Sequence, residues 1–140
     1  MVLLYKYDLQ NNLNNQKKLD DLQQLVNSDL KNVNIIIKDK IKNKINHIPK
    51  VAGHLVKAGG KRIRPMLCLA CAQLCDYKGV KHLNLAASIE FIHTATLLHD
   101  DVIDESKKRR GLRTANNIWG NKSSVLVGDF LLSKSFELMT

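Results

Sequence analysis

A cluster of carboxylates follows directly on an apolar segment of the sequence. Its four members lie within six residues: Asp100, Asp101, Asp104 and Glu105. Clustered carboxylates repel one another, so a protein gains little from them unless a cation is present. Mg²⁺ prefers oxygen ligands and is commonly held by one or two carboxylates together with substrate phosphates. The cluster is therefore either a solvated acidic helix end or a magnesium site.

Helical spacing separates the members of this cluster. If residues 85–105 are helical, Asp100 and Asp104 lie about 40° apart around the axis and share a face. His93 lies within about 20° of the same face, whereas Asp101 points about 100° away from Asp100. We therefore predict Asp100 and Asp104 as metal ligands. His93 is a candidate donor to a phosphate, although a lone histidine on an apolar helix also fits a core residue.

Two basic clusters flank the acids. Gly59-Gly60-Lys61-Arg62-Ile63-Arg64-Pro65 precedes them, and Lys107-Lys108-Arg109-Arg110 follows them. Glycines let a backbone approach a ligand closely, and a helix start favours an anion. Arginine suits bidentate contacts to phosphate. Each basic cluster alone fits an exposed cap or a solvated loop. Cations on both sides of a metal site instead predict a Mg²⁺-dependent enzyme that acts on diphosphates.

Composition restricts the fold and the partners. The 140 residues suffice for one domain, and the 7 Gly and 2 Pro provide few turn signals, which predicts an all-α fold. The net charge is +9, but many lysines are dispersed among asparagines without aromatic residues, so a nucleic-acid surface is not expected. No apolar run is long enough to span a bilayer, and the N-terminus lacks a signal-peptide pattern.

Three cysteines, Cys68, Cys71 and Cys75, stand at helical spacing in an apolar run. A second pair of ligands at zinc spacing does not follow them, so we interpret them as core residues. Free thiols suit a reducing compartment, and the expected location is cytoplasmic.

The elements that must position these residues follow from apolar periodicity. Residues 1–15 are polar and are expected to be a frayed lead-in to one domain over 16–140. Apolar residues that recur every three or four positions predict an amphipathic helix from 17 to 45 with a break near Asn27-Ser28. Shorter helices are predicted over 49–58, 65–76 and 122–140, and a buried helix over 83–105. Residues 107–113 read as a basic loop, and Thr114 as the N-cap of a short helix that ends at Gly120.

Four motifs in this order resemble those of the trans-isoprenyl diphosphate synthases, over residues 17–140. They are Gly59-Gly60-Lys61-Arg62-x-Arg64-Pro65, His93-x6-Asp100-Asp101-x-x-Asp104, Arg109-Arg110-Gly111 and Val127-Gly128-Asp129-Phe130. The long-chain, octaprenyl-type branch is the most similar. The resemblance implies the N-terminal helices of the isoprenoid synthase (polyprenyl synthetase) fold around a deep cavity, usually in a homodimer. It also implies the condensation of isopentenyl diphosphate with an allylic prenyl diphosphate.

The resemblance assigns roles to particular residues. Asp100 and Asp104 would bind Mg²⁺, and Arg109 would bind the allylic diphosphate. Isopentenyl diphosphate would be bound by Lys61, Arg64, His93 and Arg110. Two small residues just before the acids, Ala95 and Thr96, would line the cavity that sets chain length. Small side chains there predict a long product of octaprenyl class, suited to a quinone side chain.

One feature of the family is missing from these 140 residues. Family members are more than twice as long and carry a second aspartate-rich motif in their C-terminal half. We therefore expect the N-terminal half of a synthase. Such a chain could be one part of a split or heteromeric enzyme whose C-terminal half is a separate chain, or an inactive remnant. A basic helical module for nucleic acid or membrane is a further alternative, but it leaves the ordered acids unexplained.

Overall fold

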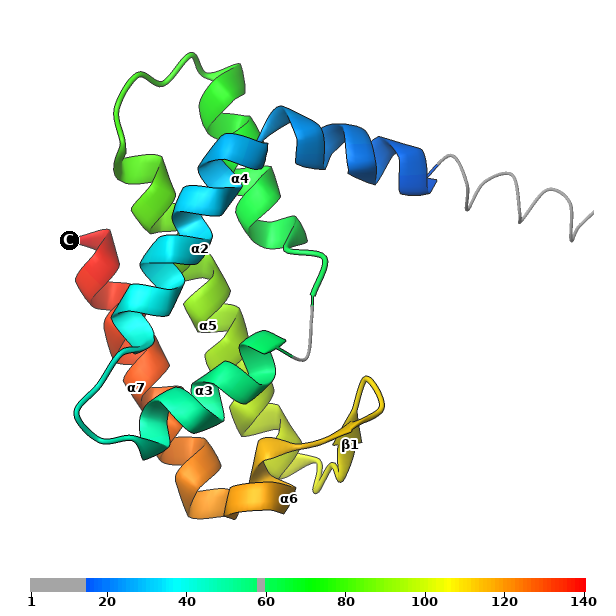
Figure 1. Cartoon of the computed structure of the whole chain (residues 1–140), viewed down its shortest axis with the longest axis vertical. Coiled ribbons are helices and arrows are strands. Elements are labelled where there is room, and N and C mark those ends of the chain that lie inside the picture. The colour runs from blue at the N-terminus through cyan, green and yellow to red at the C-terminus, as the bar shows by residue number, and fades with distance from the viewer. Residues whose placement is uncertain (1–14, 58–59) are drawn as a thin grey trace, which may run out of the picture.

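The computed structural model describes residues 15–57 and 60–140, so nearly all of the predicted lead-in lies outside it, as does Gly59. The prediction of an all-α fold is confirmed (Figure 1). A helix over 15–25 precedes six further helices: α2 (Asn27–Ile41), α3 (His47–Lys57), α4 (Ile63–Leu74), α5 (Lys81–Ile103), α6 (Ala115–Trp119) and α7 (Asn121–Met139). A hairpin of β1 (Lys108–Arg109) and β2 (Leu112–Arg113) joins α5 to α6.

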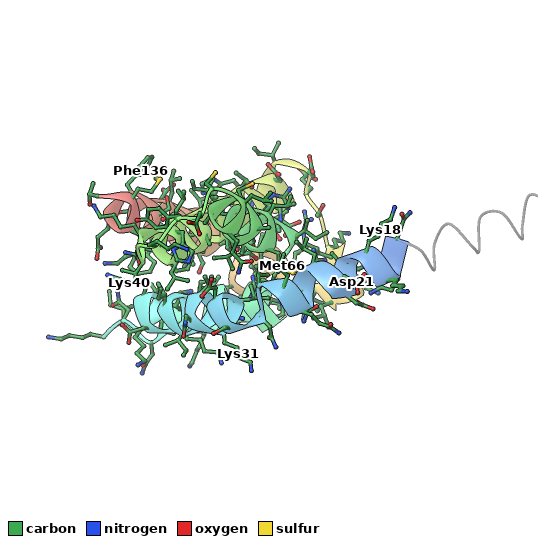
Figure 2. All side chains as sticks on the ribbon, turned by 90° about the horizontal axis from the view of Figure 1, so that it is seen from above. Lys18, Asp21, Lys31, Lys40, Met66 and Phe136 are labelled. Carbon is green, nitrogen blue, oxygen red and sulfur yellow. The ribbon has the colours of Figure 1, made fainter. Side chains whose placement is uncertain are left out.

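Helix α5 is the centre of the fold. It packs most extensively against α7 and also contacts α4 and α2. Buried residues such as Phe91 and Leu98 make it apolar on most of its surface, as the sequence predicted. Figure 2 shows α2 as an outer layer, with Lys31 pointing away from the other helices and Met66 close to the layer boundary. Helix α2 buries one stripe at helical spacing: Leu30, Val33, Ile37 and Ile41.

The predicted helix over 17–45 is two helices. The break is confirmed, and it falls at Val26, one residue before the predicted position. The predicted end at residue 45 is wrong, because α2 ends at Ile41 and Lys42 already has an extended ψ of 128°. Beyond it, the Asn43 side chain accepts a hydrogen bond from the backbone N–H of Ile45 (3.0 Å), a local bond that competes with helix formation.

The predicted basic loop after α5 is instead a β-hairpin. Lys108 pairs with Arg113 and Arg109 with Leu112, so only Arg110 and Gly111 form the turn. Both have positive φ, 51° and 81°, as a type I′ turn requires, and glycine at the second position favours it. The prediction of Thr114 as the N-cap of α6 is confirmed, although its side chain makes no capping hydrogen bond. Its hydroxyl donates to the carbonyl of Ser106 (2.6 Å) and closes the base of the hairpin.

The interpretation of the cysteines as core residues is wrong for Cys71 and Cys75, whereas Cys68 packs against the hydrophobic core. Cys68 is half-buried, whereas Cys71 and Cys75 are exposed. The buried side of α4 is formed by Pro65, Met66 and Leu69, and the cysteines face an open, mostly apolar groove of about 890 Å³ between α4, α5 and the end of α7. In the described part of the chain, every helix is too short or too polar to cross a membrane.

Small residues let α7 approach α5 closely. Ser124 Oγ donates to the carbonyl of Leu98 (3.0 Å), and Ser88 Oγ donates to the carbonyl of Ser135 (3.1 Å). Gly128 lies under the imidazole of His99, whose Nε2 is 3.3 Å from the carbonyl oxygen of Val125. The glycine of the Val127-Gly128-Asp129 motif is therefore required by helix packing.

We expect Gly128→Ala to lower the free energy of unfolding by about 1–3 kcal/mol, because its new Cβ would collide with the His99 ring. Chemical denaturation measures this effect. The matched control is Gly53→Ala in α3, where a Cβ meets open space, so the substitution should be neutral or stabilise by up to about 1 kcal/mol. The double substitution His99→Ala/Gly128→Ala should recover most of the loss. Equal effects of the two glycine substitutions would contradict this explanation.

Candidate functional site

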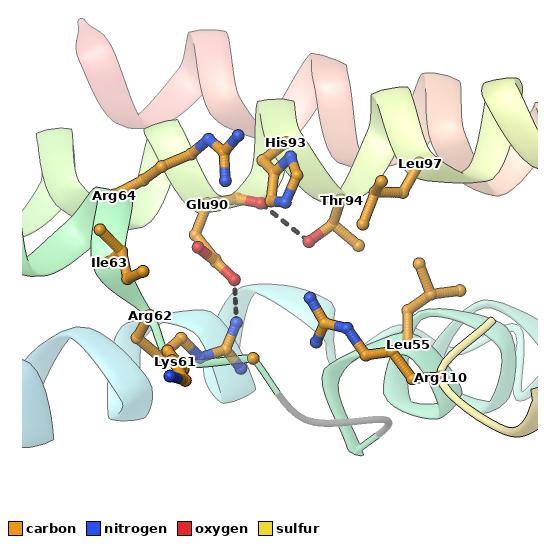
Figure 3. Close-up of a pocket in the computed structure, with 11 residues that line it drawn as sticks. Leu55, Lys61, Arg62, Ile63, Arg64, Glu90, His93, Thr94, Leu97 and Arg110 are labelled. Carbon is orange, nitrogen blue, oxygen red and sulfur yellow. Dashed lines mark hydrogen bonds and ion pairs between the residues drawn. The ribbon is translucent and has the colours of Figure 1, made fainter. Parts of the chain in front are cut away.

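A cationic pocket of about 500 Å³ lies between the start of α4, the middle of α5 and the turn of the hairpin. Figure 3 shows the side chains of Arg64 and Arg110 extending toward His93 on α5. The pocket is lined by Leu55, Gly60, Lys61, Arg62, Ile63, Arg64, Glu90, His93, Thr94, Leu97 and Arg110. The four residues that the resemblance assigned to one diphosphate are all among them, although they come from three separate segments.

The loop before α4 shapes one wall of this pocket. Gly60 lies close to the Arg110 guanidinium, since an added Cβ would be 3.1 Å from its Nη1 and would displace that side chain slightly. Lys61 Nζ donates to the side-chain oxygen of Gln16 (3.3 Å), which ties the helix over 15–25 to the loop. The loop thus brings Lys61 and Arg110 to the same cavity.

His93 is half-buried at the centre of the pocket. Burial lowers the pKa of His93 below its usual value of 6.5, Arg64 and the guanidinium groups of Arg110 and Arg109 lower this pKa further, and Glu90 opposes the shift. His93 is therefore neutral at pH 7 and has one N–H to donate. Since its pKa is lower in the folded than in the unfolded chain, its contribution to stability is present above pH 6.5 and is lost as the pH falls through the folded pKa.

Two residues of the pocket were missed by the sequence analysis. Arg62 ion-pairs with Glu90, and their side chains are only 16% and 10% exposed. Arg62 belonged to a recognised basic cluster but received no role. Glu90 stands three residues before His93 in an otherwise apolar helix, and that shared face was the signal that could have indicated it.

Asp100 lies in the last turn of α5 and Asp104 is the residue directly after it, and both are exposed. The backbone N–H of Asp104 donates to the carbonyl of Asp100 (2.8 Å), so the helical path continues through the pair. Neither residue lines the cationic pocket. Among the described residues there is no group of three or more His, Cys, Asp or Glu side chains placed to bind a metal. Two exposed carboxylates one turn apart fit Mg²⁺ when water and phosphate supply its other ligands.

Asp101 is occupied by a different interaction. Its carboxylate is 1% exposed and accepts hydrogen bonds from Arg109 Nη2 (2.9 Å) and Nε (3.1 Å). Asn116 donates to its backbone carbonyl (3.0 Å). Asp101 therefore holds the hairpin and α6 against the end of α5. Arg109 lies outside the lining of the cationic pocket, unlike its neighbour Arg110.

The two predicted chain-length residues differ in their surroundings. Ala95 is buried in the hydrophobic core, whereas Thr96 is exposed. Thr96 lies about 40° from Asp100 around the helix axis, and Ala95 about 140° away. The Thr96 hydroxyl donates to the carbonyl of His93 (2.8 Å), so it needs no partner from another element.

Comparison with known proteins identifies the family. The Polyprenyl synthetase family model matches residues 45–140, which is more than half of the chain. This chain belongs to the polyprenyl synthetase family. The match includes the cationic pocket and both predicted metal ligands.

Relatives of this family member include enzymes that are named for long-chain products. The octaprenyl diphosphate synthase of Escherichia coli (strain K12) is 47% identical over 122 residues, which are 87% of this chain and 38% of that protein. A decaprenyl diphosphate synthase from Rhodobacter capsulatus superposes with a TM-score of 0.84 at 56% identity, covering 86% of this chain and 38% of that one. A polyprenyl synthase from Caulobacter crescentus CB15, complexed with calcium and isoprenyl diphosphate, superposes with a TM-score of 0.85 at 50% identity. This match covers 86% of this chain and 37% of that one. The chain thus spans less than two fifths of these relatives.

Proposed function

We propose that this chain provides the diphosphate-binding part of a long-chain, octaprenyl-type polyprenyl diphosphate synthase. The observation that carries the proposal is the convergence of Lys61, Arg64, His93 and Arg110 on one pocket. The names of the relatives supply the reaction class, and the Caulobacter crescentus protein was solved with a divalent cation and an isoprenyl diphosphate. The substrates would be isopentenyl diphosphate and an allylic prenyl diphosphate.

Each proposed role follows from the chemistry of its side chain. Lys61, Arg64 and Arg110 would bind and orient the diphosphate of isopentenyl diphosphate, and neutral His93 would donate a hydrogen bond to it. Mg²⁺ held by Asp100 and Asp104 would supply positive charge to a leaving diphosphate.

Arg109 would contact the allylic diphosphate through the part of its guanidinium that Asp101 does not occupy. Apolar residues around the site would exclude water from the allylic cation. The double bond of isopentenyl diphosphate would attack this cation, and the chain would lengthen by one isoprene unit after loss of a proton.

A two-chain enzyme is the second candidate. Heptaprenyl diphosphate synthase component 2 of Geobacillus stearothermophilus is 35% identical over 87% of this chain, and its name denotes one component of an assembly. Exposed apolar residues on α4, α5 and α7, such as Leu74, Leu85 and Phe136, favour a further helical partner. A separate C-terminal half would cover these apolar residues. The homodimer that the family resemblance implies remains a prediction. An inactive remnant would bind diphosphate but lack turnover.

The proposed function predicts a titration result for His93. Bound isopentenyl diphosphate adds negative charge beside the imidazole, so we expect the pKa of His93 to rise when the ligand is added. NMR of the histidine side chains, with and without saturating ligand, measures this change. Arg64→Gln should weaken binding roughly tenfold or more. The control is Lys31→Gln on the outer side of α2, which should change neither quantity (Figure 2). If the pKa of His93 does not change at saturating ligand, the proposal that this pocket binds the diphosphate is wrong.

We also propose that the growing chain passes Thr96 and Ala95, because both lie just before the acids and Thr96 is exposed on the side of Asp100. In an enzyme completed with the C-terminal half of a relative, Thr96→Phe is expected to shorten the product by several isoprene units. Chromatography of the dephosphorylated products measures this. Ala95→Phe should also shorten the product, but its ring enters a closed core and should cost about 1–3 kcal/mol of stability. If the product length is unchanged in both variants, Thr96 and Ala95 do not line the path of the growing chain.

A further inference from the structure

The cationic pocket contains a carboxylate that the proposed chemistry does not use. Glu90 is the one acidic residue among the described residues that line it. Its side chain leaves α5 and points across the pocket to Arg62 (Figure 3). A negative charge beside a bound diphosphate weakens the attraction that the other side chains provide. Its presence in an anion pocket therefore requires a structural reason.

The backbone of Arg62 supplies that reason. Arg62 is the residue immediately before α4, and it has a left-handed conformation with φ of 51° and ψ of 32°. This region is unfavourable for a residue with a side chain, and here the side chain does not cap the helix. The conformation persists because surrounding contacts determine it. The contact in question is the ion pair with Glu90, which is largely shielded from water.

The turn at Arg62 determines where its neighbours point. Lys61 precedes it by one residue and Arg64 follows it by two, and both line the pocket. We propose that Glu90 is a positioning residue, whose carboxylate holds Arg62 and thereby fixes the loop that carries Lys61 and Arg64 before a diphosphate arrives. The inference rests on the proposed function of this pocket, and it assigns Glu90 no contact with the substrate.

Substituting Glu90 separates positioning from simple electrostatics, because the two predict opposite signs. Glu90→Gln removes a negative charge from the pocket, so electrostatics alone would tighten the binding of inorganic pyrophosphate. If Glu90 positions the loop, the same variant binds pyrophosphate roughly tenfold more weakly. Calorimetric titration of the 140-residue chain measures the affinity. Unchanged or tighter binding by Glu90→Gln would overturn the inference.

A double variant controls for charge and for folding. Glu90→Gln can leave Arg62 as an uncompensated, largely buried charge and so impair folding. Glu90→Gln/Arg62→Gln removes one acid and one base, which keeps the net charge of the pocket unchanged. We expect this variant to fold and still to bind pyrophosphate severalfold more weakly. Arg62→Lys, which keeps a cation opposite Glu90, should lose less affinity than Arg62→Gln. Wild-type affinity in the double variant would refute the positioning role.

A measurement without ligand keeps the two proposals distinguishable. Amide hydrogen exchange over residues 61–64 and tryptic cleavage after Lys61 or Arg62 report how firmly the loop is held. We expect both to become faster in Glu90→Gln. They should not change in Asp76→Asn, which removes the carboxylate of an exposed pair with Lys78 at another residue of positive φ. If wild-type protein fails to bind pyrophosphate, the proposed function is wrong. If the loop is equally protected in Glu90→Gln, the inference is wrong.

Discussion

Replacing Asp100 or Asp104 by asparagine is expected to remove the Mg²⁺ dependence of diphosphate binding. Both carboxylates are exposed at the end of α5, and nothing in the described part of the chain offers a third ligand beside them. The loss of either carboxylate should therefore lower the metal affinity more than the roughly 10–100-fold that is typical when a residue hydrogen-bonded to a metal ligand is replaced. Calorimetric titration of isopentenyl diphosphate with Mg²⁺, and again with EDTA, measures the metal-dependent part of the affinity.

The binding in EDTA provides an internal comparison. It depends on the cationic pocket, so it should be the same in wild type, Asp100→Asn and Asp104→Asn. Glu105→Gln is the matched control, because Glu105 belongs to the acidic cluster and is exposed but lies beyond the end of α5, where its φ of 50° breaks the helical path. It should retain the full response to Mg²⁺. If Mg²⁺ does not change the affinity of wild type, or if its effect is undiminished in both aspartate variants, the assignment is contradicted.

Asp101→Asn should act on the fold and leave the metal site intact. It removes the charge partner of Arg109 from a buried position, so we expect a loss of about 2 kcal/mol and a melting temperature several degrees lower. Circular dichroism during heating measures this effect. The adjacent aspartates of the motif thus differ in their surroundings, since Asp100 is exposed and Asp101 holds the hairpin.

The second large effect concerns turnover. We expect the 140-residue chain alone to transfer prenyl groups at least about a thousandfold more slowly than a complete relative, because one carboxylate pair stabilises the departing charge incompletely. Asp100 and Asp104 are also exposed, so water can reach an allylic cation beside them. Incorporation of labelled isopentenyl diphosphate into farnesyl diphosphate measures the rate.

Addition of a C-terminal half that carries the second aspartate-rich motif should restore much of this activity. Size-exclusion chromatography would show whether the two chains associate, and Phe136→Ser on the exposed side of α7 tests whether that surface takes part. Thr140→Ala at the exposed end of the chain is the control. Robust turnover by the monodisperse 140-residue chain would show that the single acidic cluster is sufficient.

The sequence by itself determined most of the helices and much of the pocket, but it did not reveal the hairpin. Apolar periodicity predicted the helices, and the break near Asn27 was confirmed within a residue. Glycine and proline signals separated α3 from α4. The i, i+4 spacing predicted that Asp100 and Asp104 lie together, and both are exposed at the end of α5. These features depend on residues within one or two turns of each other, and such local relations can be read from the chain.

The tertiary structure decided which charges are available. Sequence alone could not show that Glu90 faces Arg62, or that Asp101 is buried against Arg109, because these partners come from separate elements whose packing sets their distance. Nor could helical spacing show that Cys71 faces an open groove, since burial depends on which side of α4 another helix covers. The motif residues were recognisable in the sequence. Which of them make structural contacts and which remain open to a ligand follows from packing between segments far apart in the chain.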